Sequence, residues 1–484
     1  MSSEKETHRS KFRLEDLNKI TWGIFLLVIG FLLVYCVSAL WCSPPYTDVD
    51  SARYMLSALV QSEAAIVAIV ITLSLVAVQL TASSYSPRVT EIFIKTRSFW
   101  FLMFLYISAL SVDVSVLKMI KGSQEIAFTC SLMQQTIALK IVEGNPEEIL
   151  ELCIRISYSL GIICFLALIP YTLEMFTMLR PSTIINKLSY EIKKETILEE
   201  EDRIQPIIDI VRSSMTYETT KNGLVVIRSK VTDLLRNEEF EEDEREKISE
   251  KVISHFSRVG RLAVSREDED SAKEVVWNVR KMGEVIIERR CKKAAHWTAA
   301  ALENIGKVAT EKRLEEVAHK AIKALENIGK TAAEKRLGLI AHWAVDALGV
   351  IGKVLAEKRL GLIAREAVDA LGVIGKVLAE KRLGLIAHWT AAALENIGKV
   401  ATEKRLKMAA YWVIKALENI GKTATEKKLG LIAEWIIEAL ENIGKTAAEK
   451  KLENIANQTT DCLEEIGNIV KPFNSEGNSL LEEG

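Results

Sequence analysis

The pattern of hydrophobic positions changes once along this chain, near residue 180. Before that point, apolar residues form four near-continuous runs, at residues 20–41, 57–80, 99–118 and 156–179. Each run approaches the roughly 20 residues that a helix needs to cross a bilayer. Beyond that point, apolar residues recur at helical spacing among many charged ones. The pattern predicts an all-α protein, in which a four-helix transmembrane domain precedes a cytoplasmic helical part.

A longer period lies over the helical one in the C-terminal half. A glycine recurs every 23 residues, at Gly260, Gly283, Gly306, Gly329, Gly352, Gly375, Gly398, Gly421, Gly444 and Gly467. Fixed periods of this size are typical of α-solenoids. In one copy the apolar stripe runs straight through the glycine, at Leu337, Ile340, Ala341, Ala344, Leu348, Ile351 and Leu355. We therefore favour one helix per unit, stacked as in HEAT repeats, over two short helices per unit.

The repeated glycine and histidine suggest packing more than chemistry. Glycine inside a helix costs about 1 kcal/mol relative to alanine, so its recurrence indicates close approach of the next helix. Four units carry a histidine at the same position, namely His296, His319, His342 and His388, and tryptophans often follow directly. Other residues replace these histidines elsewhere, and we therefore expect a surface ladder and not a metal site.

These patterns divide the chain into five segments. Residues 1–19 form a cytoplasmic N-terminal segment, and residues 20–180 form the transmembrane domain. Residues 181–250 form a helical cytoplasmic linker, residues 251–470 the HEAT-like α-solenoid, and residues 471–484 a disordered tail. Basic residues flank the spans on the side of both termini, at Lys11, Arg13, Lys19, Arg88, Lys95, Arg97 and Arg180. The positive-inside rule then predicts a multi-pass plasma-membrane protein with both termini in the cytoplasm.

Three ionisable residues fall at similar depth in the predicted spans: Glu63, Asp113 and Arg155. Charges in hydrocarbon are costly unless they are paired or hydrated. One interpretation is a salt bridge between Arg155 and one of the acids. The other counts two acids against one base, which leaves a carboxylate to face an aqueous vestibule and concentrate cations.

Small and polar residues form a stripe along the second span. They are Ser57, Gln61, Ala64, Ala68, Thr72 and Gln79, at three- to four-residue spacing with one double step. Together with Glu63, this stripe predicts a pore lining or vestibule, formed by Gln61, Glu63, Ala68, Thr72 and Gln79. The alternative is a contact between helices of one subunit.

The most specific string of the membrane part is SLVAVQLTASSYSPR, residues 74–88. An apolar helix here passes through Gln79 into a run of serines and ends in a cytoplasmic turn, Ser86, Pro87 and Arg88. Over residues 20–235 the chain resembles a prokaryotic family of predicted membrane proteins of unknown function that carries this motif. The resemblance implies an integral membrane protein with four spans, and it implies no activity. The repeat array departs from that family.

Composition narrows the remaining function classes. The chain has 63 basic and 65 acidic residues, so its balanced charge predicts no nucleic-acid partner. Its seven cysteines show no spacing for a metal site, and no nucleotide, metalloprotease or nucleophile motif is present. We expect no enzyme, no cofactor and no bound metal.

Two function hypotheses remain, and a membrane enzyme or transporter ranks behind both. The first is a homo-oligomeric, cation-conducting channel whose second span lines the pore and whose solenoid serves assembly or gating. The second is a membrane-anchored scaffold or receptor whose solenoid binds a cytoplasmic protein. The expected partners are the lipid bilayer, further copies of the chain, ions and, on the solenoid, a cytoplasmic protein.

Overall fold

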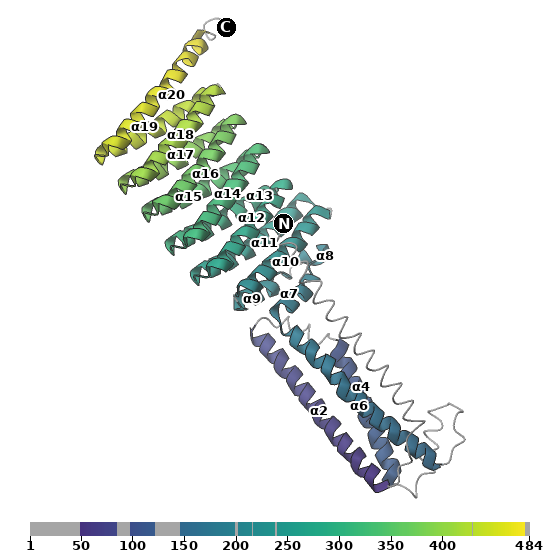
Figure 1. Ribbon diagram of the computed structural model, residues 1–484. Helices are drawn as coiled ribbons and strands as arrows, with labels where there is room; N and C mark the ends of the chain where they lie inside the picture. Colours follow the sequence, from purple (N-terminus) through teal and green to yellow (C-terminus); the bar gives the residue numbers. More distant parts are fainter. Residues whose placement is uncertain are drawn as a thin grey trace. The chain divides into compact units, whose positions relative to one another are not determined.

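The structure is a computed structural model of the 484-residue chain. It describes residues 49–84, 97–121, 146–198, 202–214, 216–237, 240–427 and 429–479, which form helices joined by short turns. The chain divides into two compact units, residues 1–184 and 185–484 (Figure 1). The predicted all-α fold is confirmed. The first predicted span and the Ser86–Pro87–Arg88 turn lie outside the described residues.

Where the structure describes it, the first unit contains three long apolar helices that pack on one another. They are α2 (Val49–Ser84), α4 (Arg97–Lys121) and α6 (Pro146–Met178). Their segments Asp50–Val76, Phe99–Ile120 and Cys153–Met178 are long and apolar enough to cross a membrane. These segments overlap the second, third and fourth predicted spans, and each helix contacts the other two.

The predicted linker is helical where the structure describes it. Its helices are α7 (Pro181–Ser189), α8 (Lys194–Ile197), α9 (Gln205–Ser214), α10 (Tyr217–Asn237) and α11 (Glu242–Ser265). Helix α9 buries one apolar side, which includes Ile207, Ile210 and Val211. Helix α10 packs on α12, and α11 packs on both α12 and α13. The stacking therefore starts in the linker, before the predicted solenoid boundary at residue 251.

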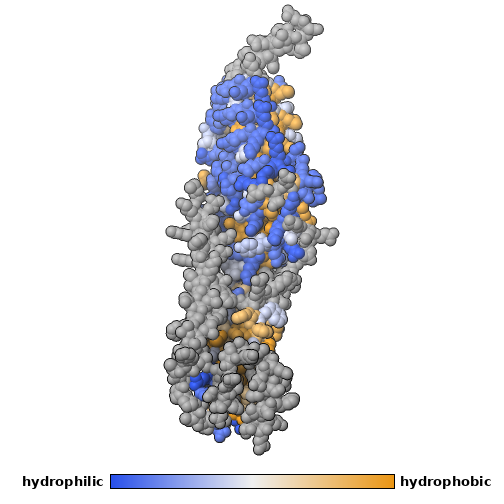
Figure 2. Space-filling model, turned by 90° about the vertical axis from the view of Figure 1, so that its right-hand side faces the viewer, coloured by the Kyte–Doolittle hydropathy of each residue, from blue (hydrophilic) through white to orange (hydrophobic). Residues whose placement is uncertain are grey.

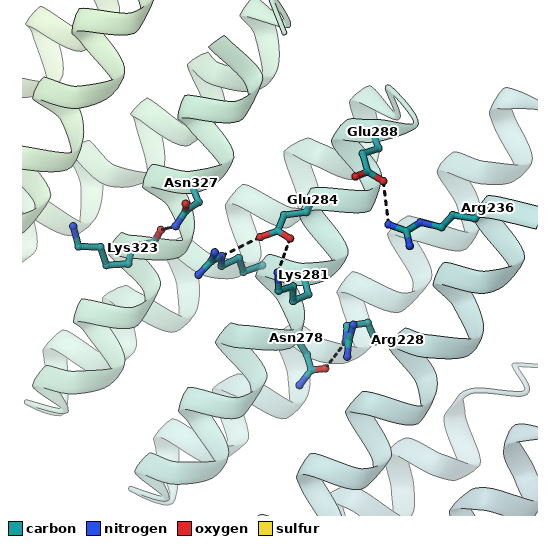
Figure 3. A network of polar contacts seen from close by, with 9 residues as sticks. Arg228, Arg236, Asn278, Lys281, Glu284, Glu288, Lys323 and Asn327 are labelled. Carbon is teal, nitrogen blue, oxygen red and sulfur yellow. Dashed lines mark hydrogen bonds and ion pairs between the residues drawn. The ribbon is translucent and has the colours of Figure 1, made fainter. Parts of the chain in front are cut away.

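Polar contacts join this linker to the repeats (Figure 3). Arg228 Nε donates to Asn278 Oδ1 at 3.0 Å, and its guanidinium lies 4.8 Å from the centre of the Trp277 ring. About two turns further along α10, Arg236 pairs with Glu288 at 3.2 Å. Two arginines of α10 thus fix its register against α12.

The repeats themselves form one helix per unit, which confirms the single-helix interpretation. The helices are α12 (Glu269–Glu288), α13 (Lys292–Glu311), α14 (Glu315–Glu334), α15 (Gly338–Glu357), α16 (Gly361–Glu380), α17 (Gly384–Glu403), α18 (Lys407–Glu426) and α19 (Gly430–Glu449). Each has 20 residues. Helix α20 (Glu453–Ser479) follows them. Three residues remain in each unit for the turn.

The turn after α14 shows how each helix ends. Lys335 closes the helix, Arg336 takes the left-handed conformation with φ 58°, and Leu337 starts the next helix. The amide of Leu337 donates to the carbonyl of Ala332 at 2.8 Å, and that of Arg336 donates to Ala333 at 3.0 Å. This pair of bonds is a Schellman motif, which satisfies carbonyls that the helix end leaves open.

The repeat helices stack in two layers, because each helix contacts both its neighbour and the helix after that. The glycine lies at the contact with the second helix on. A Cβ on Gly352 would lie 2.5 Å from Ile397 Cδ1 in α17 and 3.3 Å from Ala367 Cβ in α16. Close approach to the next helix is therefore present, but the tighter contact is made two units away.

Helix α15 is also long and apolar enough to cross a membrane. Its neighbours explain this composition, since it packs against α13, α14, α16 and α17. Ile340, Leu348, Ile351 and Leu355 are almost completely buried there. A helix covered by neighbours on several sides becomes apolar around much of its circumference.

Candidate intramembrane carboxylate site

Two carboxylic acids lie in the interior of the first unit. Glu63 of α2 and Asp113 of α4 are both 0% exposed, as is Ser157 of α6. Asp113 lies four residues after buried Ala109 and three before buried Val116, and Glu63 lies two turns from buried Leu56 and from buried Val70. One polar group from each of the three described helices thus enters the same core.

Apolar packing closes this core on both sides of the acids. Toward the start of α2 lies a cluster of Ala52, Leu56, Val116 and Ile154. Toward its end lies a second cluster, formed by Val70, Leu102, Tyr106, Ala109, Cys164, Ala167 and Tyr171. In chain order Glu63 falls between Leu56 and Val70, and Asp113 falls between Ala109 and Val116. The acids form a polar layer between two apolar ones.

The hydrogen bonds of the site are incomplete. The hydroxyl of Ser157 donates to Asp113 Oδ1. The carboxyl groups of Glu63 and Asp113 are close enough to interact directly. Both oxygens of Glu63 and Oδ2 of Asp113 are nevertheless buried without a hydrogen-bonding partner among the described residues. Buried polar atoms normally find such partners, so this layer has unused binding capacity.

A glycine of α6 makes room for Glu63. A Cβ on Gly161 would lie 3.1 Å from Glu63 Oε1 and 2.8 Å from Leu59 Cδ1. Gly161 follows Ser157 by four residues, which places both on one face of α6. The sequence interpretation did not select either residue. The signal was the pair of small residues four apart in an apolar span, a spacing common where membrane helices approach closely.

Arg155 takes another partner. Its guanidinium pairs with Glu151, one turn earlier on α6, at 2.5 Å. In the described part of the first unit, the structure shows no ion pair between a basic side chain and Glu63 or Asp113. The three predicted charges therefore separate into an ion pair within α6 and a carboxyl pair between α2 and α4.

The predicted polar stripe of α2 lies on a different face from Glu63. Gln61, Ala64, Ala68, Thr72 and Gln79 are all exposed, and Ser57 is half-buried. With about 100° between successive residues, Gln61 and Thr72 lie roughly opposite Glu63. Glu63 is thus inside the protomer, whereas the rest of the predicted lining faces outward. Thr72 donates its hydroxyl to the carbonyl of Ala68 at 2.8 Å, which reduces its polarity.

The array of repeats carries the predicted ladder of histidines and tryptophans. Three pairs follow the same geometry, each joining a helix to the second helix on. His296 lies beside Trp343 with 4.9 Å between ring centres, His342 beside Trp389 at 5.0 Å, and His388 beside Trp435 at 4.3 Å, with the ring planes tilted in each pair. His319 instead contacts Glu366, and Arg365 lies over Trp412. In the described residues these groups form no cluster of three or more metal-ligating side chains.

Fold and site together define the class: a membrane protein with helical repeats. Residues 19–247 match the family described as "Predicted membrane protein (DUF2254)", which is just under half of the chain. The match runs from the first predicted span into α11, and it agrees with the resemblance carried by residues 74–88. The repeats that follow α11 lie beyond it. No curated protein matches the chain.

Solved structures show distant likenesses. One is titled "Circular tandem repeat protein with novel repeat topology and enhanced subunit contact surfaces", with 15% identity and a TM-score of 0.41, over 80% of this chain and 98% of that one. A "DHF58 filament" has 17% identity and a TM-score of 0.18, over 53% and 99%. A chain from "Computational Design of Self-Assembling Cyclic Protein Homooligomers" has 15% identity and a TM-score of 0.15, over 61% and 98%. The fold described above rests on the helices of this chain alone.

Proposed function

We propose that this membrane protein is a homo-oligomeric, cation-conducting channel of the plasma membrane, with both termini in the cytoplasm. In this proposal the outward face of α2, with Gln61, Ala68, Thr72 and Gln79, lines a pore on the symmetry axis. The repeat array serves assembly or gating on the cytoplasmic side.

One observation carries this proposal. The amide and hydroxyl groups of the α2 stripe are exposed on the face opposite the packed core of their own protomer. Polar side chains of membrane helices normally face protein or water and avoid lipid. Copies of α2 around an axis would satisfy these groups. Their oxygen atoms would also replace part of the water around a passing cation.

Thiol accessibility tests the lining. In purified full-length protein reconstituted in planar bilayers, Thr72→Cys is treated with a water-soluble cationic thiol reagent, and the conductance is followed. We expect a block in Thr72→Cys. We expect none in Leu73→Cys, whose exposed position is about 100° further round the helix. The parent chain, measured before and after treatment, shows how much its own cysteines contribute to any block. Silent bilayers, or equal block at both positions, contradict the proposal.

The second candidate function is a membrane-anchored scaffold, and a surface feature of the repeats favours it. Leu339, Leu385 and Leu431 are 52%, 70% and 67% exposed at the second position of α15, α17 and α19. Each lies one turn before a tryptophan of the ladder, Trp343, Trp389 or Trp435. We call these six residues the leucine–tryptophan stripe. In Figure 2, hydrophobic areas lie beside a mostly hydrophilic face of the array of repeats.

A scaffold would use this stripe to bind an apolar helix of a cytoplasmic protein. The test uses a partner protein that has been identified and that binds the parent chain when both are purified. The triple variant Leu339→Ser, Leu385→Ser, Leu431→Ser should then lose this binding. The matched variant Lys353→Ser, Lys376→Ser, Lys399→Ser should keep it. An image of the purified particle separates the two functions, because a channel requires a ring with α2 at its axis.

A further inference from the structure

The polar layer between α2, α4 and α6 has the composition of a proton site. Ionised carboxylates only accept hydrogen bonds, whereas a protonated one also donates. Two adjacent ionised carboxylates therefore cannot bond to each other, and they repel. One proton between them supplies the missing donor. It would use buried oxygens of Glu63 and Asp113 that have no partner among the described residues.

Among the described residues, no basic side chain pairs with either acid. From α4 comes the Tyr106 hydroxyl, which donates to the carbonyl of Cys164 at 3.0 Å. From α6 come the Ser157 hydroxyl, the Cys164 thiol and, nearer the helix start, Tyr158 and the Arg155–Glu151 pair. Asp50 and Arg53 lie exposed in the first turns of α2.

A metal ion fits this layer poorly. Calcium takes six to eight oxygen ligands, and magnesium requires about six in a nearly octahedral arrangement. The site offers two carboxyl groups and one hydroxyl, and the described residues place no third acidic, histidine or cysteine ligand in a metal-binding group. Apolar clusters on both sides also limit the water that would complete a coordination shell.

We propose that Glu63 and Asp113 form a proton-binding site within each protomer, in which the two carboxyl groups share a proton donated by water or hydronium. Ser157 holds Asp113 by its hydroxyl, and Gly161 leaves the space in which Glu63 approaches it. The site joins α2 to the other two helices, so binding and release of the proton changes the attraction between them. This inference concerns the inner face of α2 and does not require that the protein conducts ions.

Infrared spectroscopy of the full-length protein in lipid nanodiscs tests the site. A protonated carboxylic acid has its own carbonyl stretch, distinct from that of a carboxylate, and this band moves in D₂O. We expect such a band at neutral pH, with loss of intensity as the pH is raised. The double variant Glu63→Gln, Asp113→Asn should lose the band. The control Glu174→Gln, which alters a half-buried carboxyl further along α6, should retain it.

A second variant guards against misfolding. Ser157→Ala keeps both carboxyl groups but removes the hydrogen bond to Asp113, and it should retain the band at a shifted frequency. An identical band in the parent chain and the double variant would overturn the proposal. So would disappearance of the band when Na⁺ or Ca²⁺ is added at constant neutral pH, because that result assigns an ionised pair and a metal ion to the site.

Discussion

At the scale of single residues, the repeated glycine leaves room for one side-chain atom of an isoleucine two repeats further along the chain. A Cβ at Gly352 would meet Ile397 Cδ1 at 2.5 Å, whereas a Cβ at Gly361 meets no atom within 4 Å. The two glycines lie within one turn-helix unit of each other, yet only Gly352 is required for packing. Packing thus requires glycine at the positions where two helices of the same layer touch.

We expect Gly352→Ala to be less stable than Gly361→Ala by about 1–3 kcal/mol, the usual cost of overpacking a close contact. Protection of α15 amides against hydrogen exchange in the full chain measures the difference. Ile397→Val removes the conflicting Cδ1 atom, so the double variant Gly352→Ala, Ile397→Val should regain most of the loss. Equal protection in both single variants would show that the glycine is only a copied residue.

The side chain of Asp202 joins the start of α9 to helix α11. Its Oδ1 accepts the amides of Ile204 and Gln205 at the start of α9, and Oδ2 lies 2.6 Å from Nε2 of the buried His255 in α11. Lys251 is 3.6 Å away. Although burial opposes ionisation, His255, Lys251 and these amides together lower the pKa of Asp202 from 3.8 to about 2.

A lowered pKa makes the folded linker sensitive to acid. The stabilisation is complete above the ordinary pKa of 3.8 and is lost as the pH falls through about 2. We expect α9 and α11 to lose amide protection over this interval, after correction for the intrinsic exchange rate. Asp202→Asn should lower protection at neutral pH and remove this acid-dependent part. A variant with an unchanged acid profile would assign the effect to other groups.

At the scale of elements, helix α13 is capped from a different helix. Its own N-cap residue, Cys291, makes no side-chain cap. The buried carboxylate of Glu246 in α11 accepts the amides of Lys293 and Ala294 instead, at 3.1 and 2.7 Å. Glu246 lies within the part of the chain that matches the membrane-protein family. This contact therefore joins the matched segment to the first repeats.

Glu246→Gln should loosen the first turn of α13 by about 1 kcal/mol, because an amide offers one acceptor atom and no charge to the helix start. Hydrogen exchange of the amides of residues 293–295 measures the loss. Glu250→Gln, one turn further along α11, is the matched control and should leave them protected. Equal loss in both variants would attribute the effect to α11 as a whole.

The sequence was informative for elements and much less so for the site. Periodicity places the repeat helices and three of the spans, because a solenoid helix faces neighbours on one side and water on the other. In a membrane helix both faces are apolar, since lipid and protein interior favour the same side chains. Hydrophobicity therefore could not show whether the face of α2 that carries Glu63 points to the other helices or to lipid. The pairing of Arg155 with Glu151 also depends on side-chain direction, which spacing alone does not give.

At the scale of the whole repeat array, alternate helices belong to different layers. The number of helices can therefore change without disturbing the layers only in steps of two. Deleting residues 338–383, two units of 23 residues, brings α17 into the place of α15. His296 then meets Trp389 in the position that Trp343 occupied. Deleting residues 338–360 alone brings Glu366 to that position and exchanges the layers of all later helices.

We expect a C-terminal tag to emerge at the same edge of the array as in the parent chain after the two-unit deletion, and at the opposite edge after the one-unit deletion. Electron microscopy of the labelled, purified protein measures this position. The two-unit variant should also keep its melting temperature more closely. Tags at the same edge in both variants would contradict the alternating arrangement.

The turns between the helices have a practical consequence for engineering. Among the described residues, eight of them hold a residue other than glycine at positive φ: Glu267, Arg290, Arg313, Arg336, Arg359, Arg382, Arg405 and Lys451. A side chain in this conformation costs about 1 kcal/mol, of which glycine would avoid a part. The same small change at each turn would add up along the array. Heat resistance can thus be raised and graded by the number of turns replaced, while every packed surface keeps its native side chains.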